Sequence, residues 1–125
     1  MVINCISNRK DSIASYKNLT IGKKYEVISV HFGVEVMFSD SLKSSVQYRV
    51  INDNGLTAIY PENLFEIITQ TVDDDWVIFK NNQSLFSILP ESFAYEGFWS
   101  DFIDHNKDAR NLFSYRYPEL AELLF

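Results

Sequence analysis

The stretch YRVINDNGLTAIYPENLFEII, residues 48–68, decides the fold of the first part of this chain. Apolar and polar residues alternate over 46–51, which is typical of a β-strand. Asn54-Gly55 predicts a tight hairpin turn, because both central residues of a type I′ turn need a positive φ angle. Pro61 has no backbone N–H and therefore ends the returning strand. The sequence that follows it predicts one tight helical turn and then a closing strand.

The chain before this stretch also shows strand patterns. Residues 1–6 predict one strand, and residues 19–32 predict a turn at Gly22 followed by a strand with two largely apolar faces. Two apolar faces indicate a strand that is packed on both sides. A further short strand is expected at 34–38.

The pattern changes in the second half of the chain. Residues 76–80 and 84–89 predict a second hairpin. From Glu91 onward the apolar residues recur at three- and four-residue steps, as they do on one face of a helix. We expect Asn106 to end the first helix and Pro118 to open the last one.

The first 70 residues resemble a Src-homology-3-like barrel. LTIGKKYEVISV, residues 19–30, is similar to the first diverging turn and second strand of that family, and residues 52–68 are similar to its distal hairpin, its Pro-led helical turn and its last strand. Three positions match the family pattern in that region: Pro61, Asn63 and Ile67.

Peptide-binding members of that family hold proline-rich ligands against a Trp and a Tyr. In this chain the position of the Trp falls near residues 47–49, which contain no Trp, and the position of the Tyr is Leu64. The resemblance therefore implies the barrel fold without a polyproline-binding groove.

The net charge of −6 comes entirely from the C-terminal part of the chain. Through Gln70 there are seven basic and seven acidic residues, whereas from Thr71 onward there are four basic and ten acidic residues. Nucleic-acid binding needs the opposite charge, so we expect no nucleic-acid partner. The sequence shows no signal-peptide pattern and no run of about 18 apolar residues. We therefore expect a cytoplasmic protein that does not bind membranes.

The sequence shows no known catalytic motif. It has one cysteine, Cys5, and it lacks a nucleophile elbow and a glycine-rich phosphate loop. A metal-dependent enzyme stays open as an alternative, because Asp101, His105 and Asp108 are spaced as on one helix face. We interpret His31, which lies inside a predicted strand, as structural. We expect a protein that is not an enzyme and that has no cofactor.

Carboxylates surround both tryptophans of the acidic part. An interface with a basic protein needs flat side chains at its centre and carboxylates that steer the approach. The predicted partner-binding residues are Asp73, Asp74, Asp75, Trp76, Glu96, Trp99, Asp101, Asp104 and Asp108.

By size, acidity and plan the chain resembles small bacterial immunity proteins, which neutralise a toxin that is often a nuclease. That resemblance implies a basic toxin domain as the partner, approached through long-range electrostatic steering. The alternative is an adaptor or phage accessory module that binds through the barrel surface, at Tyr48, Tyr60 or Leu64.

The expected architecture is α+β. Residues 1–70 are predicted to form the Src-homology-3-like barrel, and residues 71–125 an acidic extension that packs on it. This extension is predicted to contain a β-hairpin and two or three short helices. We expect a monomer.

Overall fold

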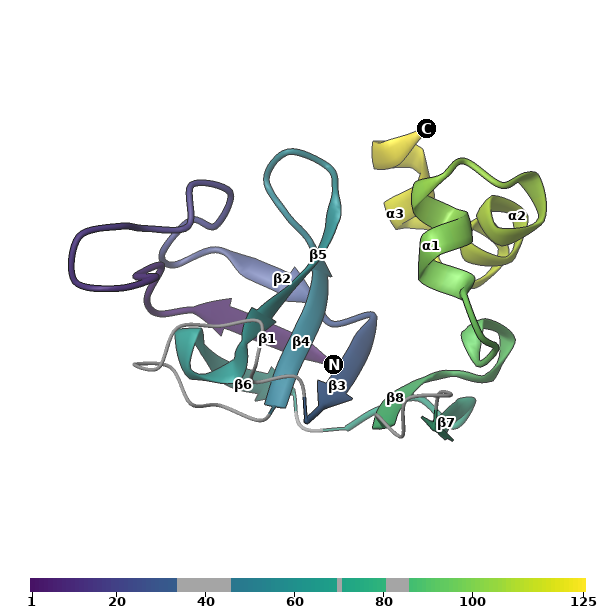
Figure 1. Ribbon diagram of the computed structural model, residues 1–125, viewed down its shortest axis with the longest axis horizontal. Helices are drawn as coiled ribbons and strands as arrows, with labels where there is room; N and C mark the ends of the chain where they lie inside the picture. Colours follow the sequence, from purple (N-terminus) through teal and green to yellow (C-terminus); the bar gives the residue numbers. More distant parts are fainter. Residues whose placement is uncertain (34–45, 70, 81–85) are drawn as a thin grey trace.

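The computed structural model describes residues 1–33, 46–69, 71–80 and 86–125. The protein is α+β, with two antiparallel sheets and three short α-helices (Figure 1). The strand expected at 34–38 and the turn of the second predicted hairpin lie outside the described residues.

Both sheets are antiparallel throughout. The first has three strands in the order β2-β1-β6, which span Lys24–Glu26, Val2–Cys5 and Phe65–Thr69. The second has five strands in the order β5-β4-β3-β8-β7, which span Thr57–Pro61, Val46–Ile51, Ser29–Phe32, Phe86–Pro90 and Trp76–Lys80.

The chain passes from one sheet to the other three times, between β2 and β3, between β5 and β6, and between β6 and β7. Between β2 and β3, the N–H of Val27 donates to the carbonyl of Met1, and the N–H of Ile28 donates to the carbonyl of Arg49, both at 2.9 Å. Between β5 and β6, the 3₁₀ turn η2 (Glu62–Leu64) forms after Pro61, as the sequence predicted. The described strands leave both sheets open, so a closed barrel stays a prediction.

The predicted hairpin at residues 46–61 is confirmed, but its turn is not of type I′. Gly55 has a φ angle of 76°, whereas Asn54 does not have a positive φ. The loop is closed by the N–H of Asn52, which donates to the carbonyl of Leu56 at 2.9 Å. This loop places Asp53 next to residues 18–25. The backbone N–H of Asp53 donates to the carbonyl of Asn18 at 2.9 Å.

The second hairpin extends the five-stranded sheet. Strand β8 pairs with β3, with Val30 opposite Ile88 and His31 opposite Ser87. The sequence had predicted this hairpin as part of an extension packed on the barrel. Its pairing with β3 makes β7 and β8 members of the same sheet as β4 and β5.

The helices follow the 3₁₀ turn η3 (Glu91–Phe93) and span Phe98–Ile103 (α1), Lys107–Arg116 (α2) and Pro118–Leu124 (α3). The break predicted at Asn106 is confirmed, because its side chain caps α2 by accepting from the N–H of Ala109 at 3.0 Å. Pro118 opens α3, as expected. No helix in the described part of the chain is long and apolar enough to cross a membrane.

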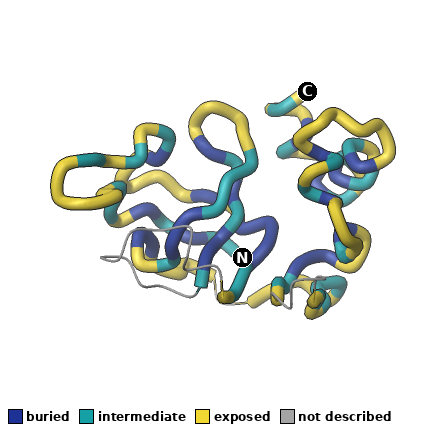
Figure 2. The backbone as a smooth tube through the Cα atoms, in the orientation of Figure 1, coloured by how far each residue is buried: buried dark blue, intermediate teal, exposed yellow. Residues whose placement is uncertain are grey.

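Two clusters of buried apolar side chains hold the layers together. Figure 2 marks the buried residues in dark blue, and they occur both in the β-strand part and in the helical part. The first lies within the N-terminal strands and includes Ile3, Val27, Val50, Tyr60 and Phe65. The second lies between the five-stranded sheet and the helices, and includes Ile28, Leu89, Phe93, Phe98, Phe102, Phe113 and Tyr117. Phe93, Phe98 and Phe102 therefore belong to the core, and the rings of Phe93 and Phe98 stack with centroids 4.3 Å apart.

Candidate functional site

The acidic run at 73–75 is partly neutralised by the protein itself. Arg116, the last residue of α2, donates from Nε and Nη2 to the two carboxylate oxygens of Asp75 at 2.6 and 2.9 Å. Its Nη2 also donates to Asp73 at 2.6 Å. Asp74 is exposed and forms no ion pair with a described residue. Two of the three carboxylates predicted to meet a partner are therefore already engaged.

Neither predicted tryptophan is an exposed anchor. Trp76 is partly buried and packs against the first core cluster. Trp99 is partly buried against the second cluster, and the guanidinium carbon of Arg49 lies 4.6 Å from its ring centroid. Both indoles therefore contribute to packing inside the protein.

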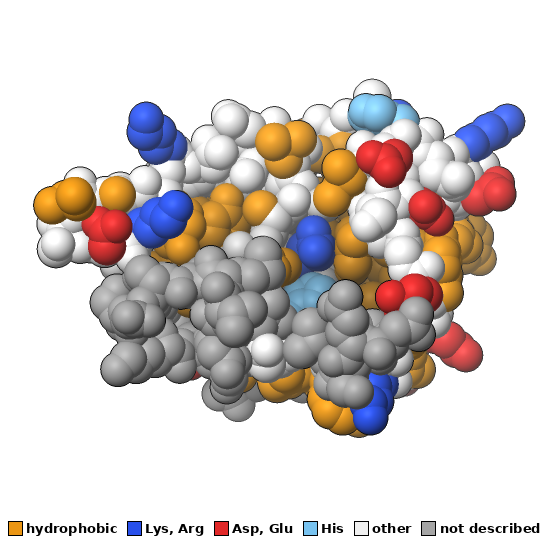
Figure 3. Space-filling view, in the orientation of Figure 1, with side chains coloured by type: hydrophobic (Ala, Val, Ile, Leu, Met, Phe, Trp, Pro, Cys, Tyr) orange, Lys and Arg blue, Asp and Glu red, His pale blue; other side chains and the backbone are white. Residues whose placement is uncertain are grey.

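The other predicted acids lie around α1 and the start of α2. We call Glu96, Asp101, Asp104 and Asp108 the α1 acidic face. None of the four forms an ion pair with a described Lys or Arg. In Figure 3 the acidic side chains gather mainly on the helical part of the molecule, whereas basic side chains are spread over the β-strand part, the middle and the helical part.

Two side chains beside the α1 acidic face can serve as contact groups. Tyr95 is 38 % exposed, and burial together with the charges of Asp101 and Asp108 raises the pKa of its hydroxyl. Ile103, on α1, is 55 % exposed. The face thus combines unpaired carboxylates with accessible aromatic and aliphatic surface, as a protein-binding surface requires.

The stripe suggested for a metal ion does not form. His105 lies between α1 and α2 with a φ angle of 65°, and its Nδ1 contacts a guanidinium nitrogen of Arg110. Because Asn106 begins a new helix, the register that would align Asp101, His105 and Asp108 is interrupted. The described residues contain no group of three or more His, Cys, Asp or Glu side chains arranged to hold a metal ion.

Sequence reasoning missed a polar group between the five-stranded sheet and the helices. Ser29 and His31 on β3 and Arg49 on β4 project from the same sheet face, because Ser29 lies opposite Arg49 in the ladder. The Oγ of Ser29 and the Nε2 of His31 are 2.6 Å apart. The Nη1 of Arg49 donates to the Oγ1 of Thr57 at 3.3 Å.

Burial controls the charge of this polar group. Burial and the nearby Arg49 charge lower the pKa of His31 from 6.5 to about 3, so the imidazole is neutral at physiological pH. Burial also lowers the pKa of Arg49 to about 10, which leaves the guanidinium charged. The signal in the sequence was the alternation of polar residues on two strands whose other positions are apolar.

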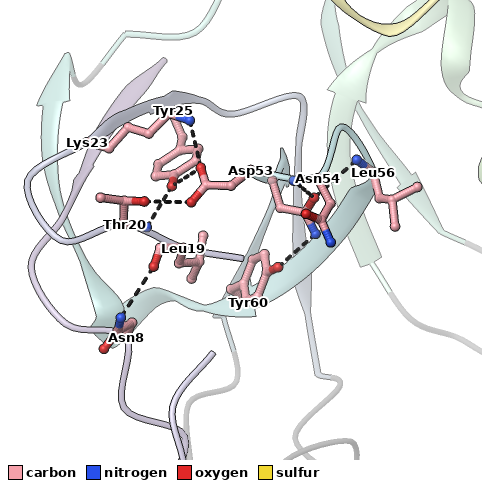
Figure 4. A network of polar contacts seen from close by, with 10 residues as sticks. Asn8, Leu19, Thr20, Lys23, Tyr25, Asp53, Asn54, Leu56 and Tyr60 are labelled. Carbon is pink, nitrogen blue, oxygen red and sulfur yellow. Dashed lines mark hydrogen bonds and ion pairs between the residues drawn. The ribbon is translucent and has the colours of Figure 1, made fainter. Parts of the chain in front are cut away.

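A second polar network holds the 19–25 segment to the β4–β5 loop (Figure 4). The carboxylate of Asp53 accepts from Thr20 and Lys23 at 2.6 Å and from Tyr25 at 2.8 Å. Burial alone would raise the pKa of Asp53, but these donors lower it below its usual value. Burial is also the main reason why the pKa of Tyr25 rises to about 12. All four residues are engaged with one another, so we interpret this network as structural.

Comparison of the chain with protein-family models, with curated proteins and with solved structures finds no match.

Proposed function

We propose that this protein is a non-enzymatic binding module of the immunity type, which neutralises a basic toxin domain by covering it with the α1 acidic face. One observation carries the proposal. Arg116 pairs with Asp73 and Asp75, whereas the carboxylates around α1 form no ion pair with a described Lys or Arg. Unpaired carboxylates produce the negative field that accelerates the approach of a basic protein.

The N-terminal strands supply the rigid base for this surface, and we propose that they form a Src-homology-3-like barrel. The strand order supports this: β1 pairs with both β2 and β6, and the chain continues from β2 through Val27 and Ile28 into the second sheet. The helical turn η2 between β5 and β6 fits the same plan.

The alternative function, an adaptor that binds through the barrel surface, is less well supported because the side chains proposed for its contact surface are buried. Tyr48 and Tyr60 are each 5 % exposed and Leu64 is 2 % exposed, so these side chains belong to the core. An adaptor would need a different contact surface.

The proposal is tested by capture from cells that produce this protein, with three baits. The first is the wild-type chain, and the second is the double variant Glu96→Gln, Asp104→Asn. The third is the matched control Glu62→Gln, Glu66→Gln, which removes two carboxylates from the η2–β6 region.

We expect the wild type and the control to retain the same basic protein at low salt and to release it as salt rises. The α1 variant should associate with that protein about tenfold more slowly, because steering depends on unpaired charge at the interface. A captured partner that is acidic, or that binds all three baits equally, contradicts the proposal.

A further inference from the structure

A cavity of about 330 Å³ lies between the loop that joins β4 to β5 and the helical part of the molecule. Figure 1 shows that loop at the same end of the molecule as α3. Leu56 lines the cavity on the strand side, and Ile103 and Phe125 line it on the helical side. These three apolar side chains are each at least half exposed. The volume lies within the range of about 300–1,000 Å³ that is typical of small-molecule sites, and an apolar occupant would remove this surface from water.

The charge of the lining is unusual for this acidic chain. Arg110 is the single Lys, Arg, Asp or Glu residue among the residues that line the cavity. Three further cavities in the described part of the chain are each lined by at least one carboxylate. The chain has 17 acidic and 11 basic residues, so a cavity with one cation and no carboxylate runs against its composition. The local charge therefore favours a negatively charged occupant.

The guanidinium of Arg110 is held in place and remains accessible. Its carbon lies 4.3 Å from the ring centroid of Phe125, and its Nη2 donates to the Nδ1 of His105. Its Nη1 has no hydrogen-bond partner among the described residues and, unlike Nε, is not enclosed by the protein. Arg110 also forms no ion pair with a described carboxylate. Since Arg110 lines the cavity, an anion bound there has an unpaired guanidinium donor within the lining.

The backbone at His105 supports a role for its side chain. His105 follows α1 with a φ angle of 65°, and its N–H donates to the carbonyl of Phe102 at 3.2 Å. Glycine or asparagine is favoured at such a helix end, because other side chains are strained at a positive φ. The imidazole lines the cavity and fixes one end of the Arg110 guanidinium, which a glycine would not do.

The lining also limits the chemistry of the occupant. The cavity carries one permanent cation, and Asp104 is the immediate neighbour of His105 in the chain, so one negative charge matches the site better than two. The apolar walls are aliphatic at Leu56 and Ile103 and aromatic at Phe125. They suit a short hydrocarbon body rather than a second polar group.

We infer that this cavity binds a small monocarboxylate with a short apolar body, whose carboxylate pairs with the Arg110 guanidinium and whose body covers Leu56, Ile103 and Phe125. The inference does not rest on the proposed function, because none of the four carboxylates of the α1 acidic face lines the cavity. A guanidinium and a carboxylate form a charge-assisted pair, so we expect the charge and the apolar body to contribute to affinity together.

Hexanoate is the probe, and the assigned backbone amide signals of the ¹⁵N-labelled full chain are the readout. Gly55 lines the cavity and Gly22 does not, so Gly22 is the internal reference. We expect hexanoate to shift the Gly55 signal in a saturable manner and to leave the Gly22 signal in place. Hexanamide has the same body without the charge, and acetate has the charge without the body. Each should bind at least about tenfold more weakly than hexanoate.

Substitutions then assign the binding to this cavity. Arg110→Gln should weaken hexanoate binding at least about tenfold, because the charge-assisted pair is lost. Lys107→Gln is the matched control, since it removes one positive charge from the same helix at an exposed position outside the lining. If Arg110→Gln does not fold, Leu56→Glu changes an exposed side chain of the lining and adds a carboxylate there. Leu56→Glu should weaken the binding of hexanoate more than that of hexanamide.

Three results would overturn the inference. The first is a Gly55 signal that hexanoate does not move. The second is binding of hexanamide or acetate that is as tight as that of hexanoate. The third is an equal affinity for hexanoate in the wild type and in the folded cavity variant, whether Arg110→Gln or Leu56→Glu.

Discussion

His31 shows how one buried side chain links the sheet to the pH dependence of stability. The pKa of its imidazole falls from 6.5 to about 3 on folding, because of burial and the Arg49 charge. The unfolded chain therefore binds a proton below pH 6.5 that the folded protein does not accept until about pH 3. The contribution of His31 to stability is complete above pH 6.5 and is lost as the pH falls toward 3.

We predict that the free energy of unfolding decreases between pH 6.5 and 5 by on the order of 1.5 kcal/mol more in the wild type than in His31→Gln. Urea unfolding at pH 7, 6.5, 6, 5.5 and 5 measures this difference. The pKa of Asp53 is lowered, so its contribution to stability is lost only at a more acidic pH. Asp53 therefore does not produce the decrease expected from His31. Equal slopes for His31→Gln and the wild type would contradict the prediction.

At the scale of the elements, the pairing of Arg116 with Asp73 and Asp75 fastens the 71–75 segment to the end of α2. The hydrogen bonds that Arg116 donates to Asp75, and then those that it donates to Asp73, raise its pKa. Asp75 also accepts from the N–H of Glu91 through its backbone carbonyl, at 2.8 Å. The side chain of Asp75 is 40 % exposed and that of Asp73 is 66 % exposed, so solvent screens the second pair more strongly.

We predict that Asp75→Asn lowers the free energy of unfolding by about 1 kcal/mol, because a bidentate charge-assisted contact is weakened. Asp73→Asn should cost about half as much or less, since its contact is single and more exposed. Asp74→Asn removes the same charge from the neighbouring position and is the control, with no loss expected. Chemical denaturation measures all three variants. An equal loss of unfolding free energy in the three variants would contradict the prediction, because it would show that the contacts of Arg116 with Asp75 and Asp73 do not contribute to stability.

The elements that were predicted correctly depend on contacts between residues that are close together in the sequence. The β4–β5 hairpin follows from the local turn signal at Gly55, and the break between α1 and α2 follows from the capping residue Asn106. The type of turn could not be predicted, because Asp53 is held by Thr20, Lys23 and Tyr25, about 30 positions away.

The candidate site was predicted only in part, for the same reason. The carboxylates around α1 were identified from local composition, whereas the engagement of Asp75 by Arg116 joins residues 41 positions apart. Ser29, His31 and Arg49 lie on one face only because β3 and β4 pair in a particular register. A single sequence contains the alternation of each strand but not the register between them.

At the scale of the whole molecule, the two buried clusters share strands β4 and β8, because Val50 and Ile88 pack in the first cluster and Ile51 and Leu89 in the second. Val27 belongs to the first cluster and Ile28, the next residue, belongs to the second. Strand β3 pairs with β4 on one side and with β8 on the other. Separation of the helical part from the sheet would expose Ile28 and the polar face that carries His31 and Arg49. The two clusters therefore depend on each other.

We predict that the protein unfolds in one cooperative transition, because neither cluster can lose its packing without exposing the strands shared with the other. Trp76 packs on the first cluster and Trp99 on the second, so the variants Trp99→Phe and Trp76→Phe each leave one fluorophore that reports on one cluster. In each variant, the urea midpoint from fluorescence should coincide with the midpoint from far-ultraviolet circular dichroism. Because each comparison is made within a single variant, any change of stability caused by the substitution cancels. A fluorescence midpoint that precedes the circular dichroism midpoint in Trp76→Phe, but not in Trp99→Phe, would show that the helical part separates first and would contradict a single cooperative unit.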